Sequence, residues 1–369
     1  MLQKKGRHTT HHRDFPNSVI ITRERHPFEG SVLAVIGSIR RRGVLFVLAC
    51  LPDGSRALIP AQWTDWDEGH CGGVRACREA NLGSRALGNL GDFDPSRDAL
   101  SNEQLEEIDR WMLDRTAELV KKCREWYANY EFHRVYHAIH DYCVVDLSSF
   151  YFDLLKDRLY TKAPRNNSRR SAQTAVWKIA SALVRLAAPI LVFTSEEIWK
   201  YLPKLKGEPE SVHMTLFPEA ELLACGIAKY AAEKWEGLAQ VRSAVLVALE
   251  QARAARVIGG GLEAKVHLHA GPEAPGLQKL LEEKLPILPA LFIVSQVKVA
   301  PSAIAASVPA ETLPGLTIKI ERADGAKCER CWNYSTHVGE NNRYPTVCER
   351  CTEALAEIES GGSASVAVT

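Results

Sequence analysis

Four cysteines near the end of the chain have a spacing that could bind a metal ion. They form two Cys-x-x-Cys pairs, and sixteen residues separate the inner two cysteines. Each pair can present two thiolates from one tight turn, and a hairpin between the pairs would close a tetrahedral four-sulfur site, as in zinc ribbons. Four protein ligands leave no position for a reacting water molecule. The spacing therefore predicts one structural zinc ion, with the ligands Cys328, Cys331, Cys348 and Cys351.

Two disulfides or four unrelated thiols are the alternative interpretations of these cysteines. Disulfides form in oxidising compartments, and residues 1–13 contain basic residues and histidines without the apolar segment of an export signal. Unrelated thiols would not be expected to repeat the run Cys-Glu-Arg-Cys, which occurs at both pairs. Zinc is therefore favoured, and we expect a cytoplasmic protein whose other cysteines are reduced thiols.

The composition is that of an ordinary globular protein. Of the 369 residues, 46% are hydrophobic and 25% are charged, and the formal net charge is +1. This length allows two or three domains. No apolar run reaches membrane-spanning length, because three arginines at 40–42 interrupt the stretch 32–51. With so little net charge, any surface that binds nucleic acid must be local.

Residues 15–66 are predicted to form a small β-rich module of unknown function. Short segments rich in Val, Ile and Leu alternate there with turn signals, for example at 52–54. Glycines interrupt any period in the stretch that follows, so residues 67–84 are interpreted as a linker or junction.

Residues 85–256 have the periodicity of a helical domain. Apolar residues recur every three or four positions in four long segments, which predicts an antiparallel helical bundle. The first helix should begin with a capping box at Ser101. The third should begin at Ser168 and kink at Pro189. The fourth should span residues 221–256 and end at the glycines that follow.

After the helical domain the period shifts towards two. Residues 257–322 are predicted to form a small α/β connecting module, residues 323–357 the zinc ribbon, and residues 358–369 a disordered tail. The expected fold class is mainly α: a helical bundle, a small α/β module and a four-cysteine ribbon, preceded by the β-rich module.

Several runs of residues resemble the anticodon-binding domain of class I aminoacyl-tRNA synthetases. They include Leu-Gly-Asn-Leu at 87–90 and Asp-Arg-Trp at 109–111. The runs Val-Asp-Leu-Ser-Ser-Phe-Tyr at 145–151 and Lys-Asp-Arg-Leu-Tyr at 156–160 are particularly similar to the bacterial isoleucyl-tRNA synthetases. The tail that ends in the ribbon, with Trp332 after its second cysteine, is similar to that family as well. The resemblance covers roughly residues 85–357.

The resemblance implies that the chain binds the anticodon arm of tRNA(Ile). It also implies that the chemistry lies elsewhere, because the family's His-x-Gly-His and Lys-Met-Ser-Lys-Ser motifs do not occur in this sequence. The sequence also shows no resemblance to the family's editing domain. We therefore expect no catalytic residues, no ATP site and no aminoacylation by this chain alone. A separate polypeptide that carries the catalytic domain remains an open alternative as a partner of this chain.

The β-rich module weakly resembles a small uncharacterised family found near transposases. The shared runs are His-Pro-Phe at 26–28, Asp-Gly-Ser at 53–55 and residues 59–65. Two alternatives to tRNA(Ile) binding follow from this combination. The chain could be a nucleic-acid-binding accessory or decoy protein, or it could be a gene-fusion product without a function.

Basic and aromatic residues in two regions are candidate tRNA contacts. Arginine and lysine bind phosphates without reading sequence, and tryptophan can stack on an unpaired base. The alternatives are a solvated helix start for the first region, and a tryptophan that seals the ribbon's own core for the second. Cations around the cysteines would also offset the negative charge of a zinc tetrathiolate. The candidates are Arg165, Arg169 and Arg170 in the first region, and Lys327, Arg330, Trp332 and Arg350 in the second.

Overall fold

The computed structural model describes most of the chain as two compact units, Met1–Asn81 and Leu82–Thr369. The predicted linker at 67–84 lies outside the described residues. Among the described residues, no helix is long and apolar enough to cross a membrane. The described residues are 18–22, 30–41, 44–50, 56–61, 64, 87–302, 304–305 and 307–363.

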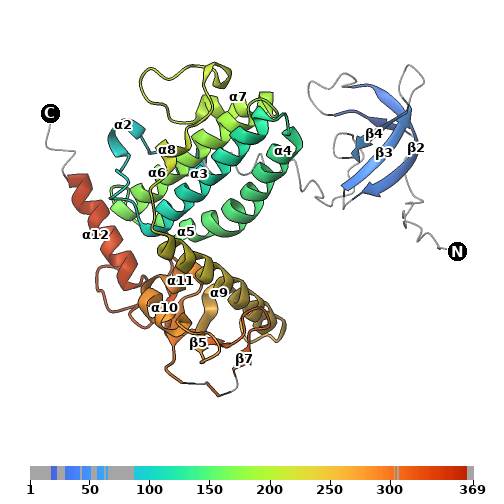
Figure 1. The fold of residues 1–369 in the computed structure, drawn as a ribbon. Coiled ribbons are helices and arrows are strands. Elements are labelled where there is room, and N and C mark those ends of the chain that lie inside the picture. Colours follow the sequence, from blue (N-terminus) through green and yellow to red (C-terminus); the bar gives the residue numbers. More distant parts are fainter. Residues whose placement is uncertain are drawn as a thin grey trace. The chain divides into compact units, whose positions relative to one another are not determined.

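The N-terminal unit contains an antiparallel sheet in the order β1-β2-β3-β4 (Figure 1). The strands are β1 Ser18–Ile20, β2 Val32–Arg41, β3 Val44–Cys50 and β4 Arg56–Pro60. Residues at alternate positions, such as Val19 and Ile21, form its small apolar core because side chains alternate between the two faces of a strand. The predicted β-rich fold of this part is confirmed.

The second unit begins with the predicted helical bundle, in which α3, α5 and α6 lie side by side (Figure 1). A π-helical segment, η2, joins α4 to α5, so the three form one continuous rod. The mainly α fold class is confirmed. The bounds are α2 Pro95–Asp98, α3 Glu107–Ala128, α4 Phe132–Asp141, η2 Tyr142–Tyr151, α5 Phe152–Thr161, α6 Asn167–Ala187, α7 Val192–Tyr201, the 3-10 turn η3 Val212–Met214, α8 Ala220–Leu223 and α9 Lys229–Ala254.

Helix ends differ from the sequence-based expectations. The expected capping box at Ser101 forms a turn, in which its backbone N–H donates to Gln104 Oε1 at 3.1 Å, and α3 begins only at Glu107. Helix α6 begins after Asn166, whose side chain accepts from the Ser168 N–H at 3.1 Å. Because α6 ends at Ala187, Pro189 follows the helix and does not kink it.

The fourth predicted helix is two helices, α8 and α9. The backbone N–H groups of Cys225, Gly226 and Ile227 turn towards Asp114 of α3 and donate to its carboxylate at 2.5, 3.1 and 2.8 Å. Backbone donors that bind a side chain are withdrawn from the helical ladder, so the helix stops at Leu223 and restarts at Lys229.

A buried ionic network joins the middle of the bundle. Asp109 of α3 is fully buried and accepts two hydrogen bonds from Arg158 of α5, at 3.0 and 2.6 Å. The Tyr151 hydroxyl donates to the same carboxylate at 2.7 Å, and the Ser171 hydroxyl of α6 donates at 2.5 Å. A buried charge persists only when it is paired and hydrogen-bonded. The network therefore fixes the register of three helices.

A mixed sheet in the order β6-β5-β8-β7 follows the bundle. Strand β5 pairs in parallel with β6 and antiparallel with β8, and its alternate residues from Ala264 to Ala270 are buried. Arg242 of α9 donates to the Leu291 and Ser149 carbonyl oxygens, at 2.9 and 3.0 Å, and so ties this module to η2. The bounds are η4 Gly261–Glu263, β5 Ala264–Ala270, α10 Leu277–Lys284, η5 Leu285–Ile287, α11 Leu288–Phe292, β6 Gln296–Val299, β7 Val308–Pro309 and β8 Leu316–Arg322.

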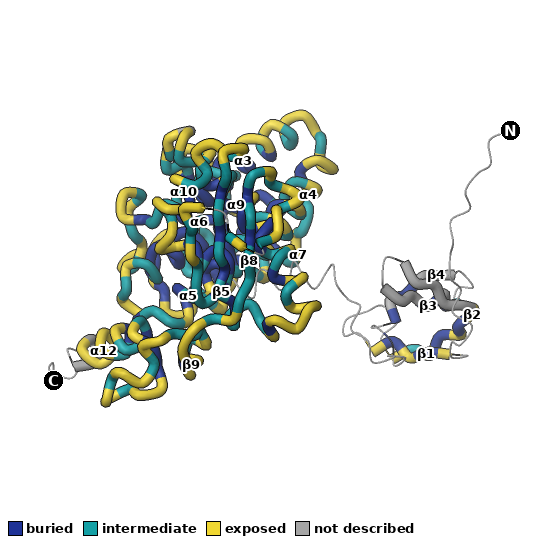
Figure 2. The backbone as a smooth tube through the Cα atoms, turned by 90° about the horizontal axis from the view of Figure 1, so that it is seen from below, coloured by how far each residue is buried: buried dark blue, intermediate teal, exposed yellow. Residues whose placement is uncertain are grey.

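The last elements are a short hairpin and one helix. The strands are β9 Ala326–Lys327 and β10 Tyr334–Ser335, and the helix is α12 Glu349–Ser363. Figure 2 shows that α12 is largely exposed, in contrast to the buried inner faces of the bundle. The helix continues past the ribbon end expected at residue 357 and into the expected disordered tail, of which residues 364–369 lie outside the described part.

Candidate metal centre and nucleic-acid interface

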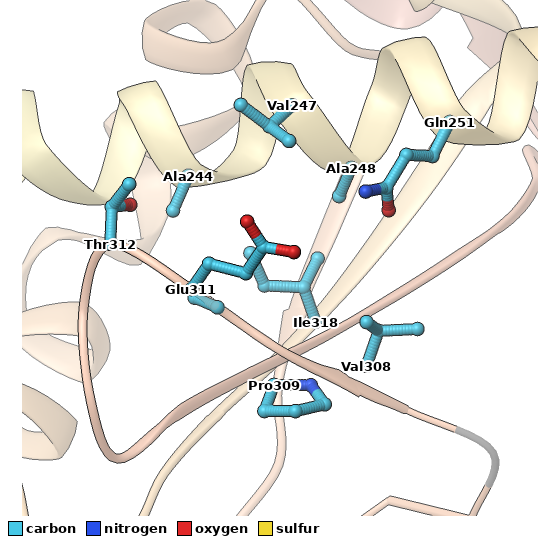
Figure 3. A pocket seen from close by; sticks show the side chains of 10 residues that line it. Ala244, Val247, Ala248, Gln251, Val308, Pro309, Glu311, Thr312 and Ile318 are labelled. Atoms are coloured by element: carbon cyan, nitrogen blue, oxygen red, sulfur yellow. The ribbon is translucent and has the colours of Figure 1, made fainter.

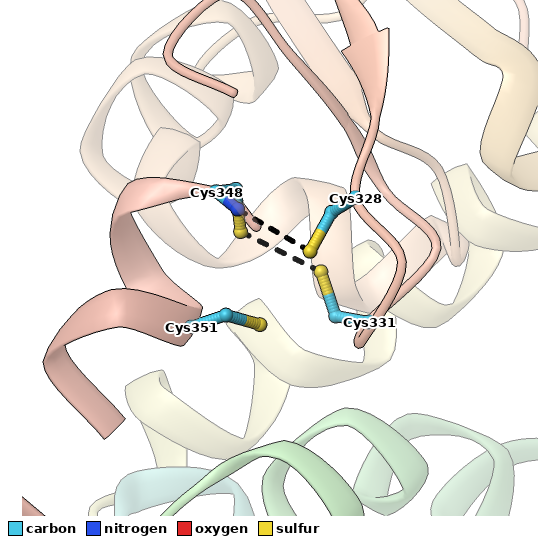
Figure 4. A group of neighbouring side chains, drawn as sticks. All are labelled: Cys328, Cys331, Cys348 and Cys351. Carbon is cyan, nitrogen blue, oxygen red and sulfur yellow. Dashed lines mark hydrogen bonds between the residues drawn. The ribbon is translucent and has the colours of Figure 1, made fainter. Parts of the chain in front are cut away.

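The four cysteines of the ribbon converge on one point (Figure 4). Cys328 and Cys331 come from the loop after β9, and Cys348 and Cys351 from the start of α12, with all four sulfurs within 4.8 Å of one another. The Cys331 and Cys348 sulfurs are 3.6 Å apart. A zinc ion with Zn–S bonds of about 2.3 Å requires sulfurs about 3.8 Å apart. The site therefore fits a tetrahedral zinc ion.

Hydrogen-bond donors surround the sulfurs. The Cys348 N–H donates to Cys328 Sγ at 3.3 Å, and the Asn333 amide donates to Cys331 Sγ at 3.6 Å. Hydrogen bonds from Cys331 and Cys351 lower the pKa of the Cys348 thiol, whereas donating to Cys348 raises the pKa of Cys331. One sulfur of the group thus accepts negative charge readily. Four thiolates at this separation require a cation between them.

The loop that carries the first cysteine pair exposes Trp332. Its backbone has φ = 65°, in the left-handed region that usually needs glycine, and its N–H donates to the Cys328 carbonyl oxygen at 2.9 Å. The indole is 60% exposed, and Lys327 Nζ lies 5.4 Å from the ring centroid. The tryptophan therefore does not seal a core. Lys327 and Trp332 together form an exposed cation–aromatic pair.

Arg330 and Arg350 face the bundle. The Arg330 guanidinium donates to the Thr161 carbonyl oxygen at 2.6 Å and to Cys351 Sγ at 3.5 Å. Arg350 forms an ion pair with Asp157 of α5. Both arginines were expected at a tRNA surface, and their groups are engaged within the chain; a direct tRNA contact by either stays a prediction.

The three arginines near the start of α6 lie in different surroundings. Arg170 is buried and donates to the Asp92 carbonyl oxygen at 3.1 Å and to Gln173 Oε1 at 2.8 Å. Arg169 pairs with the Asp92 carboxylate at 2.8 Å. Arg165, in the α5–α6 loop, is exposed. Of these three predicted contacts, the structure leaves the Arg165 side chain on the surface.

One further surface group was not expected from the sequence. Tyr160 is 68% exposed in the last turn of α5, next to Thr161, which contacts Arg330 of the ribbon. The run that contains it is amphipathic, and the sequence alone does not say which turn of that run is left uncovered. Tyr160 and Arg165 thus offer one exposed aromatic and one exposed cationic side chain within four residues of Thr161, which contacts the ribbon.

A small hollow lies between α9 and the β7–β8 edge of the sheet (Figure 3). Its volume is about 70 Å³, well below the few hundred Å³ of a typical small-molecule site. Its walls are mostly aliphatic, and Gln251, Glu311 and Thr312 are the polar side chains that line it. It lacks the converging polar groups of an active site.

The bundle and the ribbon match two protein families. Residues 109–268 match the anticodon-binding domain of tRNA ligases, and residues 325–354 match the zinc finger found in FPG and IleRS. The bundle is thus similar to the anticodon-binding domains of the tRNA-ligase class, and the four-cysteine site to the zinc finger of that second family.

Curated relatives that match the chain include several isoleucine–tRNA ligases. Those of Symbiobacterium thermophilum and Syntrophotalea carbinolica are each 44% identical, over 277 and 287 residues, which is 74% and 76% of this chain. That of Histophilus somni is 42% identical over 276 residues, 75% of this chain. The resemblance of residues 85–357 to the isoleucyl-tRNA synthetases is confirmed, and the weak resemblance of the N-terminal module stays a prediction. The match spans 29% of the length of each of these relatives.

Proposed function

We propose that this chain binds the anticodon arm of tRNA(Ile). The observation that carries the proposal is the exposed Lys327–Trp332 pair on a zinc finger, joined to an anticodon-binding domain. Sequence-specific recognition of RNA targets unpaired loop bases, which stack on aromatic side chains. An aromatic ring held open to solvent beside a cation supplies both the stacking surface and the phosphate contact.

The proposed RNA-binding surface includes the adjoining end of the bundle. Arg165 would contact backbone phosphates, and Tyr160 offers a second stacking ring. Phosphate contacts give affinity that falls with salt, whereas stacked and hydrogen-bonded bases give selectivity among tRNAs. A surface that combines the two should therefore show salt-dependent and tRNA-selective binding.

We further propose that Cys328, Cys331, Cys348 and Cys351 are the ligands of one structural zinc ion. When bound, the ion supplies a cross-link between the loop after β9 and the start of α12. Cys348→Ser should abolish stoichiometric zinc in the purified protein, as measured by elemental analysis, and weaken tRNA binding. Cys225→Ser, at a partly buried cysteine outside the ribbon, is the control that should retain the metal. Intact tRNA affinity after zinc loss would contradict the role of the ribbon.

This 369-residue chain is proposed to bind without catalysing aminoacylation. The proposal rests on the sequence, which contains neither His-x-Gly-His nor Lys-Met-Ser-Lys-Ser. Isoleucine-dependent exchange between ATP and pyrophosphate measures adenylate formation directly. We expect none from the chain alone, and a rate above the background without isoleucine would overturn this part of the proposal.

A titration of the zinc-loaded protein with labelled tRNA(Ile) tests the binding function. A non-cognate tRNA and duplex DNA serve as competitors, and the titration is repeated at several salt concentrations. Selective binding that weakens with salt is the expected result. Equal and weak binding to all three nucleic acids would refute anticodon recognition and favour an accessory role or a chain without a selected function.

A further inference from the structure

Three polar contacts join the ribbon to one end of the bundle. Arg330 donates to the carbonyl oxygen of Thr161, the last residue of α5, at 2.6 Å. Arg350 forms an ion pair with Asp157, one turn earlier in the same helix. The Asn166 amide, at the start of α6, donates to Glu357 of α12 at 3.2 Å. These contacts link the first cysteine loop and α12 to the end of α5 and the start of α6. This part of the bundle, residues 157–166, is called the α5–α6 corner.

The charges of these contacts suit the helix ends that they meet. The last carbonyl groups of a helix lack partners within the helix and carry partial negative charge, so a guanidinium is favourable at the end of α5. The first N–H groups carry partial positive charge, so the carboxylate of Glu357 is favourable at the start of α6. The ribbon thus complements both ends of the corner.

Arg330 connects this corner to the metal site. The same Nη1 that donates to the Thr161 carbonyl oxygen also donates to Cys351 Sγ at 3.5 Å. A hydrogen bond to a thiolate is stronger than one to a neutral thiol, because the acceptor is charged. A site that holds its sulfurs as thiolates therefore also holds Arg330, and through it the end of α5.

The opposite side of the ribbon is held without the metal. The Tyr334 N–H of β10 donates to the Ser295 hydroxyl at 2.7 Å, and Ser295 donates in turn to the Leu262 carbonyl oxygen of the α/β module. This anchor contains no cysteine and no arginine. The hairpin therefore has an anchor on the α/β module that does not depend on the cysteines.

We propose that Arg330 and Arg350 are positioning residues, which dock the metal-loaded ribbon on the α5–α6 corner. Docking brings the exposed Lys327–Trp332 pair of the ribbon and the bundle's Tyr160 and Arg165 into one RNA-binding surface. The inference rests on the proposed function for its consequence in binding. The docking itself rests on the contacts alone. Direct contact of either arginine with tRNA phosphates is the alternative that the following experiment distinguishes from docking.

A charge exchange between Arg350 and Asp157 separates docking from direct phosphate contact. Arg350→Glu and Asp157→Arg each place like charges at the contact, whereas the double variant restores an opposite pair. Amide hydrogen exchange in residues 157–166 of the full zinc-loaded chain reports docking, and titration with tRNA(Ile) reports binding. Arg253→Glu is the matched control, because its side chain is 43% exposed, against 42% for Arg350, and its partner is on its own helix.

Docking predicts faster exchange at 157–166 and a loss of tRNA affinity of about three- to tenfold in each single variant. The double variant should restore both. Unchanged exchange in the single variants, or faster exchange that the double variant fails to restore, would overturn docking. Restored exchange with unrestored affinity would show that Arg350 contacts RNA directly, and would overturn its positioning role. If the unmodified chain binds no tRNA, the proposed function fails, and the exchange data alone decide the docking.

The link through Arg330 is tested by removing the metal. Chelation of zinc in the unmodified chain should speed exchange at 157–166. In Arg330→Ala, which keeps all four cysteines, exchange should already be fast and chelation should add little. A colorimetric zinc assay confirms that this variant is loaded before the measurement. An equal response to chelation in both proteins would refute the link.

Discussion

Replacing Trp332 by glycine should separate RNA binding from ribbon stability. A buried tryptophan costs about 3–5 kcal/mol when it is truncated. Trp332 is 60% exposed and its backbone has φ = 65°, so little buried area is lost and backbone strain is relieved. The indole should matter mainly to the ligand that it contacts.

The magnitude of the stability change follows from three contributions. A non-glycine residue in the left-handed region costs about 1–2 kcal/mol, which glycine removes. Glycine gives back about 0.5–1 kcal/mol because it gains more freedom in the unfolded chain. The lost cation–π contact with Lys327 costs about 0.5–1 kcal/mol at an exposed site. The sum lies within about 1 kcal/mol of zero.

The expected loss of binding is larger. Stacking on an aromatic side chain contributes about 1–3 kcal/mol per base, which corresponds to a loss of roughly 5- to 150-fold in affinity for tRNA(Ile). Trp332→Phe keeps a stacking ring and should retain most of the affinity. Trp332→Ala keeps the strained backbone and should be the least favourable of the three for the ribbon.

Two measurements test this prediction on the same proteins. Competition with a chromophoric chelator reports how firmly each variant holds zinc, and fluorescence anisotropy with labelled tRNA(Ile) reports affinity. The reasoning is refuted if Trp332→Gly weakens zinc retention by more than about 3 kcal/mol, which would indicate a core role. It is also refuted if the affinity for tRNA is unchanged.

Three further predictions follow from the described contacts. Asp109→Asn should lower the free energy of unfolding by up to about 3–5 kcal/mol, because it removes the buried carboxylate that pairs with Arg158 and leaves only the ion pair with the more exposed Glu106, at 3.2 Å; urea unfolding followed by circular dichroism measures this loss. Arg165→Gln should reduce the slope of log K against log salt by about 0.7, the value for one contact to single-stranded RNA, in the tRNA titration. The hydrogen bond to Glu340 raises the pKa of His337 in the folded protein. The stability that this contact contributes should therefore be complete below the pKa of His337 in the unfolded chain, and should be lost as pH rises through its pKa in the folded protein; NMR titration of the imidazole measures the shift.

Matched variants make these predictions specific. Asp146→Asn removes a partly exposed ion pair with Arg115 and should cost less than about 1 kcal/mol, so an equal loss at both aspartates would contradict the burial argument. Arg170→Gln should reduce stability with little effect on the salt slope, because that side chain is buried. Glu340→Gln should return the His337 pKa towards its ordinary value, and an unchanged pKa would exclude the pair as the cause.

The local pattern of the sequence was enough to predict the metal site and the main elements. The ligands of a ribbon come from two short turns, so the spacing of Cys328, Cys331, Cys348 and Cys351 describes the site almost completely. The helices of the bundle bury one face each, and their apolar periodicity is written in neighbouring residues. The runs at 145–151 and 156–160 were also sufficient to indicate the isoleucyl family.

The ends of helices depended on residues far away in the sequence. Helix α8 ends at Leu223 and α9 begins only at Lys229, because Asp114, more than a hundred positions earlier, accepts hydrogen bonds from the backbone N–H groups of residues 225–227. The helix start that was expected at a Ser101 capping box lies instead at Glu107, whose carboxylate accepts from the Trp235 indole of α9 at 3.0 Å. The helix propensities of neighbouring residues cannot reveal hydrogen-bond partners that are distant in the sequence.

Only the tertiary structure decided which cations face solvent. In the sequence Arg165, Arg170, Lys327 and Arg350 are equivalent, because each is a basic residue near a predicted turn or helix start. Folding brings Arg350 to Asp157 and buries Arg170 against Asp92, and it leaves Arg165 and Lys327 on the surface. A cationic side chain that pairs with a carboxylate of the protein is less available to a ligand than a cationic side chain that is exposed on the surface. That distinction depends on distances across the folded chain, and spacing along the sequence does not contain it.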